Sequence, residues 1–114
     1  MILHKYQALG NDFLILDCIS HKENENLRSS ENFFHFVCEK SDRKRIGCDQ
    51  FIVMEKSQNA NCKIVFYNAD GSRAEACGNG TVASAVYFAS VFGGNIVQIE
   101  TDVKVVQARV LGNE

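Results

Sequence analysis

The chain has 114 residues, of which 46% are hydrophobic and 23% charged, and its formal net charge is −2. These values are typical of one soluble globular domain, and they exclude the strongly basic surface expected of a nucleic-acid-binding domain. The five cysteines are odd in number and contain no C-x-x-C pair, which argues against a disulfide framework and a structural zinc site.

The first residues predict a hairpin and do not have the pattern of a secretion signal. Residues 1–6 and 13–18 have the apolar pattern of two strands, and residues 9–12 have the composition of a turn. Asn11 lies in this turn, where a turn-forming role competes with a ligand-binding one. No basic segment followed by an apolar one opens the chain, so we expect no signal peptide and a cytoplasmic protein.

The next segment changes from polar to aromatic. Residues 20–30 are polar and predict a solvated loop, and phenylalanines at helical spacing predict a surface helix over residues 30–40. The basic cluster at residues 41–45 is typical of a solvated face. Two further strands are expected at residues 51–54 and 62–67, joined by a hairpin loop at residues 57–61.

A turn and a cysteine follow these strands. Asn68-Ala69-Asp70-Gly71-Ser72 has turn chemistry, in which Gly71 can take a positive φ. Cys77-Gly78-Asn79-Gly80 then stands where the next element begins. The unpaired N–H groups and the positive dipole end of a helix favour a thiolate or a bound carboxylate at such a position.

The element that begins there is predicted to be a buried central helix. Thr81–Phe92 carries no charged residue, and a helix that is apolar on every side is expected to be buried on every side. Gly93-Gly94 ends it, and residues 96–100 and 103–110 read as a last hairpin. Because tight turns join most of the strands, we predict an α+β fold in which an antiparallel, barrel-like sheet curls around this helix.

Four motifs identify a family that this pattern resembles. They are Gly10-Asn11-Asp12-Phe13, Asp49-Gln50, Asn68-Ala69-Asp70-Gly71-Ser72 and Cys77-Gly78-Asn79-Gly80. In this order and spacing, the whole chain closely resembles the N-terminal half of diaminopimelate epimerase. The resemblance implies one half of a two-domain fold, with residues 1–114 as the first domain and the active site between the two halves.

The resemblance also implies roles for particular residues. Cys77 would be one of two acid/base thiols, while Asn11 and Asn68 would bind the substrate and Gln50 would order the pocket near the thiols. The N–H groups of Gly78 and Asn79 would hold the substrate α-carboxylate. The chain departs from the family pattern at Arg45, where glycine is usual, and at Val82-Ala83, where Arg-Cys is common.

The implied reaction is epimerisation of LL- to meso-diaminopimelate, a step of bacterial lysine biosynthesis, without metal or pyridoxal phosphate. Inversion needs two opposed acid/base groups, because a single base stays on the face that it deprotonated. The chain supplies one thiol, so we expect it to be a half-enzyme whose partner is its missing C-terminal half. In isolation it should be inactive, unless a homodimer pairs two copies of Cys77.

Two alternatives remain open at this point. One is an amino-acid racemase or isomerase of the same fold that acts on another substrate. The other is a non-catalytic half-domain that binds a carboxylate at Gly78 and Asn79. A cysteine hydrolase is disfavoured, because the three histidines of the chain lie in segments unrelated to Cys77.

Overall fold

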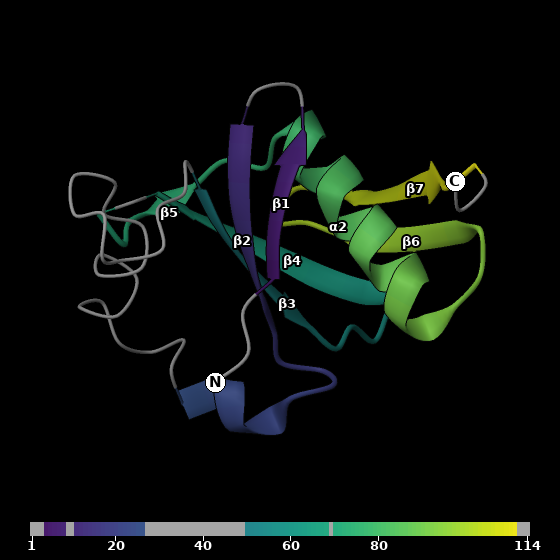
Figure 1. The fold of residues 1–114 in the computed structure, drawn as a ribbon, viewed down its shortest axis with the longest axis horizontal. Helices are drawn as coiled ribbons and strands as arrows, with labels where there is room; N and C mark the ends of the chain where they lie inside the picture. Colours follow the sequence, from purple (N-terminus) through teal and green to yellow (C-terminus); the bar gives the residue numbers. More distant parts are fainter. Residues whose placement is uncertain (1–3, 9–10, 27–49, 69, 112–114) are drawn as a thin grey trace.

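The chain folds into a mixed sheet that curves around one long helix (Figure 1). The computed structural model describes residues 4–8, 11–26, 50–68 and 70–111. The elements in this part are β1 (His4–Ala8), β2 (Asn11–Asp17), the 3-10 helix η1 (Lys22–Asn26), β3 (Gln50–Glu55), β4 (Cys62–Asn68), β5 (Arg73–Ala74), α2 (Gly78–Phe92), β6 (Ile96–Glu100) and β7 (Val105–Arg109). The helix predicted over residues 30–40, the basic cluster and Arg45 lie outside the described residues.

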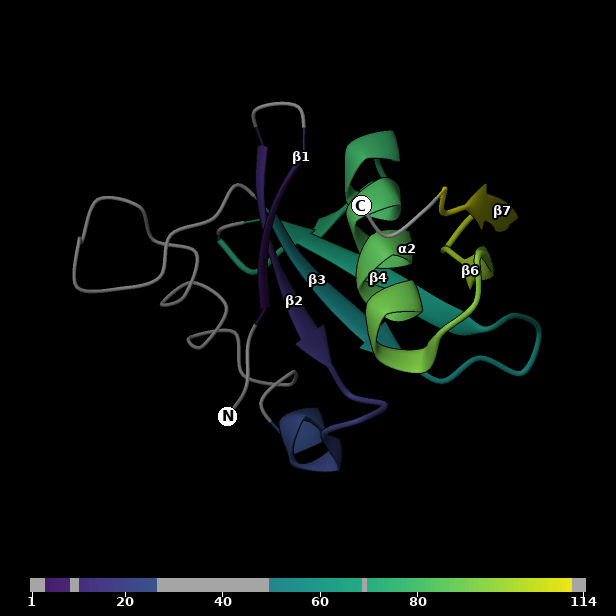
Figure 2. The same cartoon turned by 45° about the vertical axis from the view of Figure 1, so that its right-hand side comes forward.

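Three predicted hairpins are confirmed. Strand β1 pairs with β2, β3 with β4, and β6 with β7, all in antiparallel register. Asn11 was expected in the tip of the first hairpin, but it is the first residue of β2 and pairs with Ala8. Figure 2 shows the first hairpin on one side of α2 and the last hairpin on the other.

The prediction of an all-antiparallel, barrel-like sheet is wrong in two respects. Strands β2 and β3 are parallel, as are β4 and β6. Each of these pairs is joined by a long connection and not by a tight turn, and only a long connection allows parallel pairing. The sheet order is β1-β2-β3-β4-β6-β7, with β5 on β4, so the two outermost strands do not pair with each other and the barrel is not closed. The fold is therefore an open mixed sheet.

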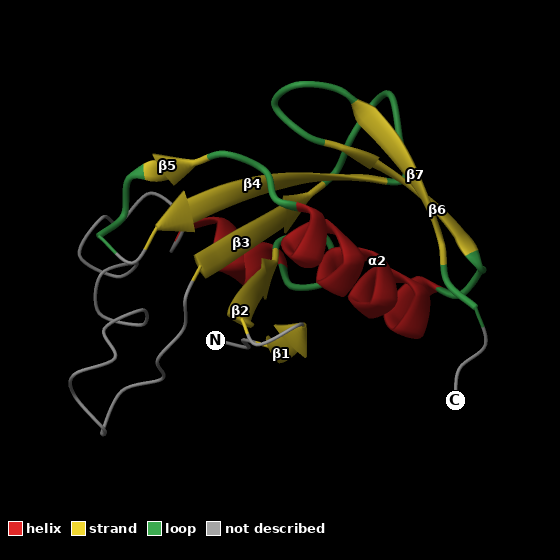
Figure 3. Ribbon diagram, turned by 90° about the horizontal axis from the view of Figure 1, so that it is seen from above, coloured by secondary structure: helices red, strands yellow, loops and turns green. Residues whose placement is uncertain are grey.

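Helix α2 is buried on one side only, which corrects the prediction that it is buried all round. Its inner side carries Ala83, Ala85 and Tyr87, which belong to the buried core. Figure 3 shows the helix lying along one face of the curved sheet. On the outer side Val82 is 56% exposed and Val86 41% exposed. The absence of charge on α2 therefore predicted apolar faces correctly, but the open sheet covers only one of them.

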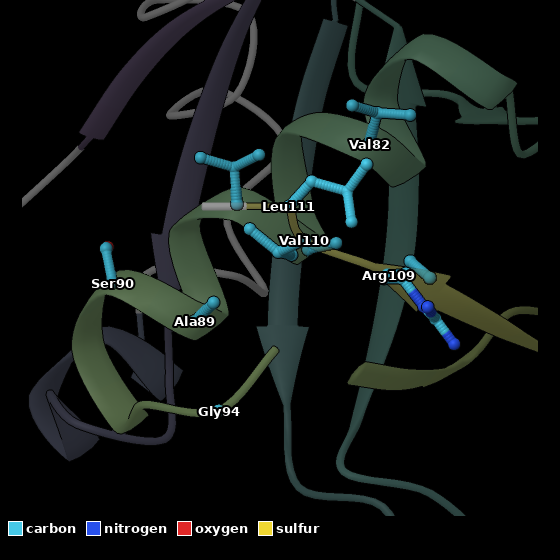
Figure 4. A pocket seen from close by; sticks show the side chains of 10 residues that line it. Val82, Ala89, Ser90, Gly94, Arg109, Val110 and Leu111 are labelled. Carbon is cyan, nitrogen blue, oxygen red and sulfur yellow. The ribbon is translucent and has the colours of Figure 1, made fainter. Parts of the chain in front are cut away.

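An apolar groove runs along this outer side, between α2 and the end of β7. Val82 and Val86 line it from the helix, and Val110 and Leu111 line it from the C-terminal end of the described chain. Figure 4 shows Val82, Val110 and Leu111 around the groove. The groove has a volume of about 450 Å³. Patches of exposed apolar side chains of this kind mark surfaces that another element or chain can cover. Of the described helices, none has both the length and the hydropathy needed to cross a membrane.

A buried hydrogen bond ties the inner side of α2 to the sheet. Tyr87 Oη donates to Oδ2 of Asp17, at the end of β2, over a distance of 2.5 Å. Oδ1 of the same carboxylate accepts the backbone N–H groups of Ile19 and Ser20. Burial on its own raises the pKa of Asp17, but these hydrogen bonds together hold that pKa below the ordinary value of 3.8.

Replacing Tyr87 by phenylalanine tests this anchor. We expect Tyr87→Phe to lower the free energy of unfolding at neutral pH by about 1–3 kcal/mol, because a buried carboxylate loses a hydrogen bond. The pKa of Asp17 is lower in the folded chain than in the unfolded chain, so the stabilisation is complete above the unfolded value of 3.8. It is lost as the pH falls through the lower, folded pKa. The deficit of the variant, measured by urea unfolding, should therefore shrink in acid.

The double variant with Asp17→Asn is the control for this measurement. If the effects of Tyr87→Phe and Asp17→Asn on the free energy of unfolding simply add, the two side chains are not coupled and the proposed anchor is wrong.

Candidate active site

The pairing of the strands brings three of the predicted site residues to one end of the sheet, where β2 and β3 begin and β4 finishes. Gln50, the first residue of β3, pairs with Asn68, the last residue of β4, and with Phe13 of β2. Asn11 lies two residues before Phe13, at the start of the same parallel strand. Neighbouring strands lie about 4.8 Å apart, so Asn11, Gln50 and Asn68 share one end of the sheet although up to 57 residues separate them.

The N-terminus of α2 lies at this same end of the sheet. Cys77 is the N-cap residue of the helix, as predicted, and its Sγ accepts the backbone N–H of Gly80 at 3.3 Å. The Cys77 thiol also donates to Oε1 of Gln50 at 3.4 Å. Gln50 and Cys77 are therefore in direct contact.

Two N–H groups of the first helical turn are available to a ligand. The N–H of Gly80 bonds Sγ of Cys77, and the N–H and Oγ1 of Thr81 both donate to the carbonyl oxygen of Cys77. Thr81 donates the first intrahelical hydrogen bond, so the N–H groups of Gly78 and Asn79 have no partner inside the helix, and neither donates to another described residue. Together with the helix dipole they form a suitable site for a carboxylate.

Gly80 explains how the helix comes so close to the sheet. A Cβ atom at this position would lie 2.3 Å from Cε2 of the buried Phe66 ring in β4. At Gly78 a Cβ atom would have no neighbour within 4 Å. Gly80 thus serves close packing, whereas Gly78 leaves an open approach to the helix start. The sequence motif did not distinguish these two roles.

The turn before the helix holds Asn68 in place. Ser72 Oγ donates to Oδ1 of Asp70 at 2.6 Å and accepts from Nδ2 of Asn68 at 3.2 Å. Gly71 has φ +89°, the positive value that the turn composition predicted. The expected turn is confirmed, and it fixes the amide of Asn68 through Ser72.

A cavity of about 990 Å³ opens beside the thiol. It lies between the N-terminus of α2, the segment that contains β5, and the β6–β7 hairpin, and Cys77, Gly78 and Val82 line it. Arg73 and Asp102 form an ion pair on its wall, and the Arg73 guanidinium lies 5.8 Å from the centre of the Tyr67 ring. No sequence signal pointed to this pair, because 29 residues separate its members. Asn11, Gln50, Asn68 and Asn79 do not line this cavity.

The other described cysteines have different surroundings. Cys18 and Cys62 are buried, and no disulfide joins any of the described cysteines. Burial, together with the nearby charge of Asp17, raises the pKa of Cys62 to about 12. Within the described ranges no three His, Cys, Asp or Glu side chains are grouped closely enough to hold a metal ion.

The two glycines provide a matched pair of variants. We expect Gly80→Ala to lower the free energy of unfolding by about 1–3 kcal/mol, because the new methyl group collides with Phe66. We expect Gly78→Ala to be neutral or slightly stabilising, because the site is open and alanine favours a helix. Thermal or urea unfolding of both variants decides the matter, and equal stabilities would contradict the packing role of Gly80.

Thiol alkylation should separate Cys77 from Cys62. Cys77 is partly exposed beside the cavity, whereas Cys62 is buried and has a raised pKa, so iodoacetamide at mildly alkaline pH should modify Cys77 at least about tenfold faster. Peptide mapping by mass spectrometry gives the rate for each cysteine. Equal rates in the folded chain would mean that the Cys77 thiol is not accessible from the cavity.

Comparison with known proteins shows to which family the chain belongs. The family model described as diaminopimelate epimerase matches residues 3–110. Among curated relatives, diaminopimelate epimerase of Pelagibacter ubique is 33% identical over 109 residues, covering 96% of this chain and 37% of the relative. The enzyme named so in Aquifex aeolicus is 38% identical, covering 96% of this chain and 41% of the relative. For Hydrogenobaculum sp. the identity is 42%, and the match covers 75% of this chain and 32% of the relative.

Solved structures show the same fold at lower identity. A phenazine biosynthesis protein of the PhzF family from Bacillus anthracis is 19% identical, with a TM-score of 0.64, and the match covers 94% of this chain and 34% of that one. One from Enterococcus faecalis is 9% identical, with a TM-score of 0.62. The chain spans only about a third to two fifths of the length of the relatives that it matches.

Proposed function

Because the chain belongs to the diaminopimelate epimerase family, we propose that it is the N-terminal part of a cofactor-independent epimerase that interconverts LL- and meso-diaminopimelate. The observation that supports this most is the arrangement at the start of α2. There the Cys77 thiol donates a hydrogen bond to Gln50, and the N–H groups of Gly78 and Asn79 in the same turn have no partner inside the helix. Such an enzyme would serve lysine biosynthesis in the cytoplasm.

In this proposal Cys77 is one of two acid/base groups. A thiolate takes the α-proton from one face of the substrate carbon, and a thiol returns a proton to the opposite face. The electron pair left by the broken C–H bond is delocalised into the adjacent carboxylate. Hydrogen bonds from the N–H groups of Gly78 and Asn79 to that carboxylate stabilise the charge as it develops.

In the same proposal, the amide side chains at this end of the sheet make the remaining contacts with the substrate. Asn11 and Asn68 bind the polar groups of the substrate, and the Ser72 hydroxyl holds the Asn68 amide in one orientation. Arginine is common in the family at the position of Val82, which here lines the cavity beside Cys77. An apolar side chain at that place gives the cavity a less positive wall.

We propose that the second thiol comes from the part of the protein that is absent from this chain. The relatives are more than twice as long, and the outer side of α2 and the groove beside β7 offer an apolar surface against which that part can pack. The isolated chain should then be inactive, because it presents a thiol to only one face of the substrate.

A chimera tests this function. Residues 1–114 replace the matching N-terminal segment of the Aquifex aeolicus relative, and deuterium from the solvent is measured at the α-carbon of diaminopimelate. We expect exchange by the chimera and none by the isolated chain. In the chimera, Cys77→Ala should reduce the exchange rate by at least about a hundredfold, the range associated with one acid/base group.

Cys62→Ala in the chimera is the matched control, because this buried thiol takes no part in the proposed reaction. It should retain exchange at temperatures below its unfolding midpoint. A chimera that is folded by circular dichroism but does not exchange the α-proton would contradict the proposed substrate. Unchanged exchange in the Cys77→Ala chimera would remove Cys77 from the mechanism.

A further inference from the structure

The Sγ atom of Cys77 makes two hydrogen bonds of opposite kinds. It accepts the N–H of Gly80, and it donates its own proton to Oε1 of Gln50. A thiolate can still accept from Gly80, but it has no proton to donate to Gln50. The observed contact with Oε1 therefore belongs to the thiol form, and loss of the proton would leave a carbonyl oxygen facing a negatively charged sulfur.

The amide of Gln50 is able to respond to that change. It carries an acceptor, Oε1, and a donor, Nε2–H, of nearly the same size and shape. Its bond to Cys77 is the one side-chain hydrogen bond that Gln50 makes within the described part of the chain. The terminal torsion of a glutamine is soft, so the amide can turn over without disturbing the packing around β3.

We propose that Gln50 is a positioning residue that supports both protonation states of Cys77 by turning its amide. When Cys77 is a thiol, Oε1 accepts its proton; when Cys77 is a thiolate, Nε2–H donates to the sulfur. The inference rests on the proposed function for its purpose, since a thiol that acts in both directions of an epimerisation must alternate between acid and base. As acid, it breaks its S–H bond and forms the substrate C–H bond, and the sulfur keeps the electron pair; as base, it does the reverse.

The charged groups around Cys77 do not take this role. Among the described residues, Arg73, Glu75, Asp102, Lys104 and Arg109 line the same cavity, but none of them hydrogen-bonds Sγ. A fixed anion in contact with the sulfur would favour the thiol, and a fixed cation would favour the thiolate. A neutral amide that can present either end stabilises both forms.

Two variants of the 114-residue chain separate this role from a fixed acceptor. Gln50→Glu presents oxygen only, so the alkylation rate of Cys77 near neutral pH should fall by about tenfold, because the thiolate loses a donor and gains a like charge. Gln50→Met keeps the length but has no strong donor or acceptor. If Gln50 supports both states, this variant should alkylate within about threefold of the original rate, since both forms lose a similar bond.

A fixed acceptor predicts another result for the methionine variant. Only the thiol would then lose a hydrogen bond, and Cys77 would alkylate several-fold faster in Gln50→Met. That result, or an unchanged rate in Gln50→Glu, would overturn the proposal. Circular dichroism of each variant confirms that the rates refer to folded protein, and mass spectrometry assigns them to Cys77.

Heteronuclear NMR observes the amide directly. In the chain with Cys62→Ala, the side-chain N–H signals of Gln50 should change over the same pH range as the β-carbon signal of Cys77, which reports on the protonation of that one thiol. With Cys77→Ser added, they should stay constant through that range. Gln50 signals that do not move while Cys77 titrates would overturn the proposal. These measurements need no substrate. They can therefore overturn the role of Gln50 while the chimera still exchanges the α-proton, and they can support that role even if the chimera does not.

Discussion

The close approach of Gly80 to the Phe66 ring is the contact on which the candidate site depends. A residue with a side chain at position 80 would push the first turn of α2 away from β4. With glycine there, the turn lies at the ends of β3 and β4, and Cys77 comes within hydrogen-bond distance of Gln50. Helix placement and thiol environment are thus two consequences of one packing constraint.

The two sides of α2 have different surroundings: the inner side packs in the core, and the outer side is exposed. On the inner side, Tyr87 reaches the Asp17 carboxylate and ties the middle of the helix to β2. On the outer side, Val82 and Val86 face an apolar groove instead of a layer of sheet. In the proposed two-part enzyme, the inner side of α2 stabilises this part of the protein and the outer side is available to pack against the other part.

Local patterns predicted much of the fold, because hairpins, the positive φ of Gly71 and the helix start after Cys77 follow from nearby residues. The parallel pairs were missed, since they depend on long connections whose course no local period encodes. The lack of charge on α2 predicts burial on every side, but composition cannot tell which part of a protein covers an apolar face. The pairing of Gln50 with Asn68 arises from strand register, so only the family resemblance placed these residues together.

We propose that the start of α2 and the adjacent strand ends form half of a substrate site. The most direct test is an NMR titration of the 114-residue chain with diaminopimelate, compared with cadaverine, the same diamine without carboxylates. We expect saturable shifts at the backbone N–H groups of Gly78 and Asn79 and at the side-chain amides of Asn11 and Asn68 with diaminopimelate, and none with cadaverine. Equal shifts with both ligands, or shifts confined to the groove between α2 and β7, would contradict it.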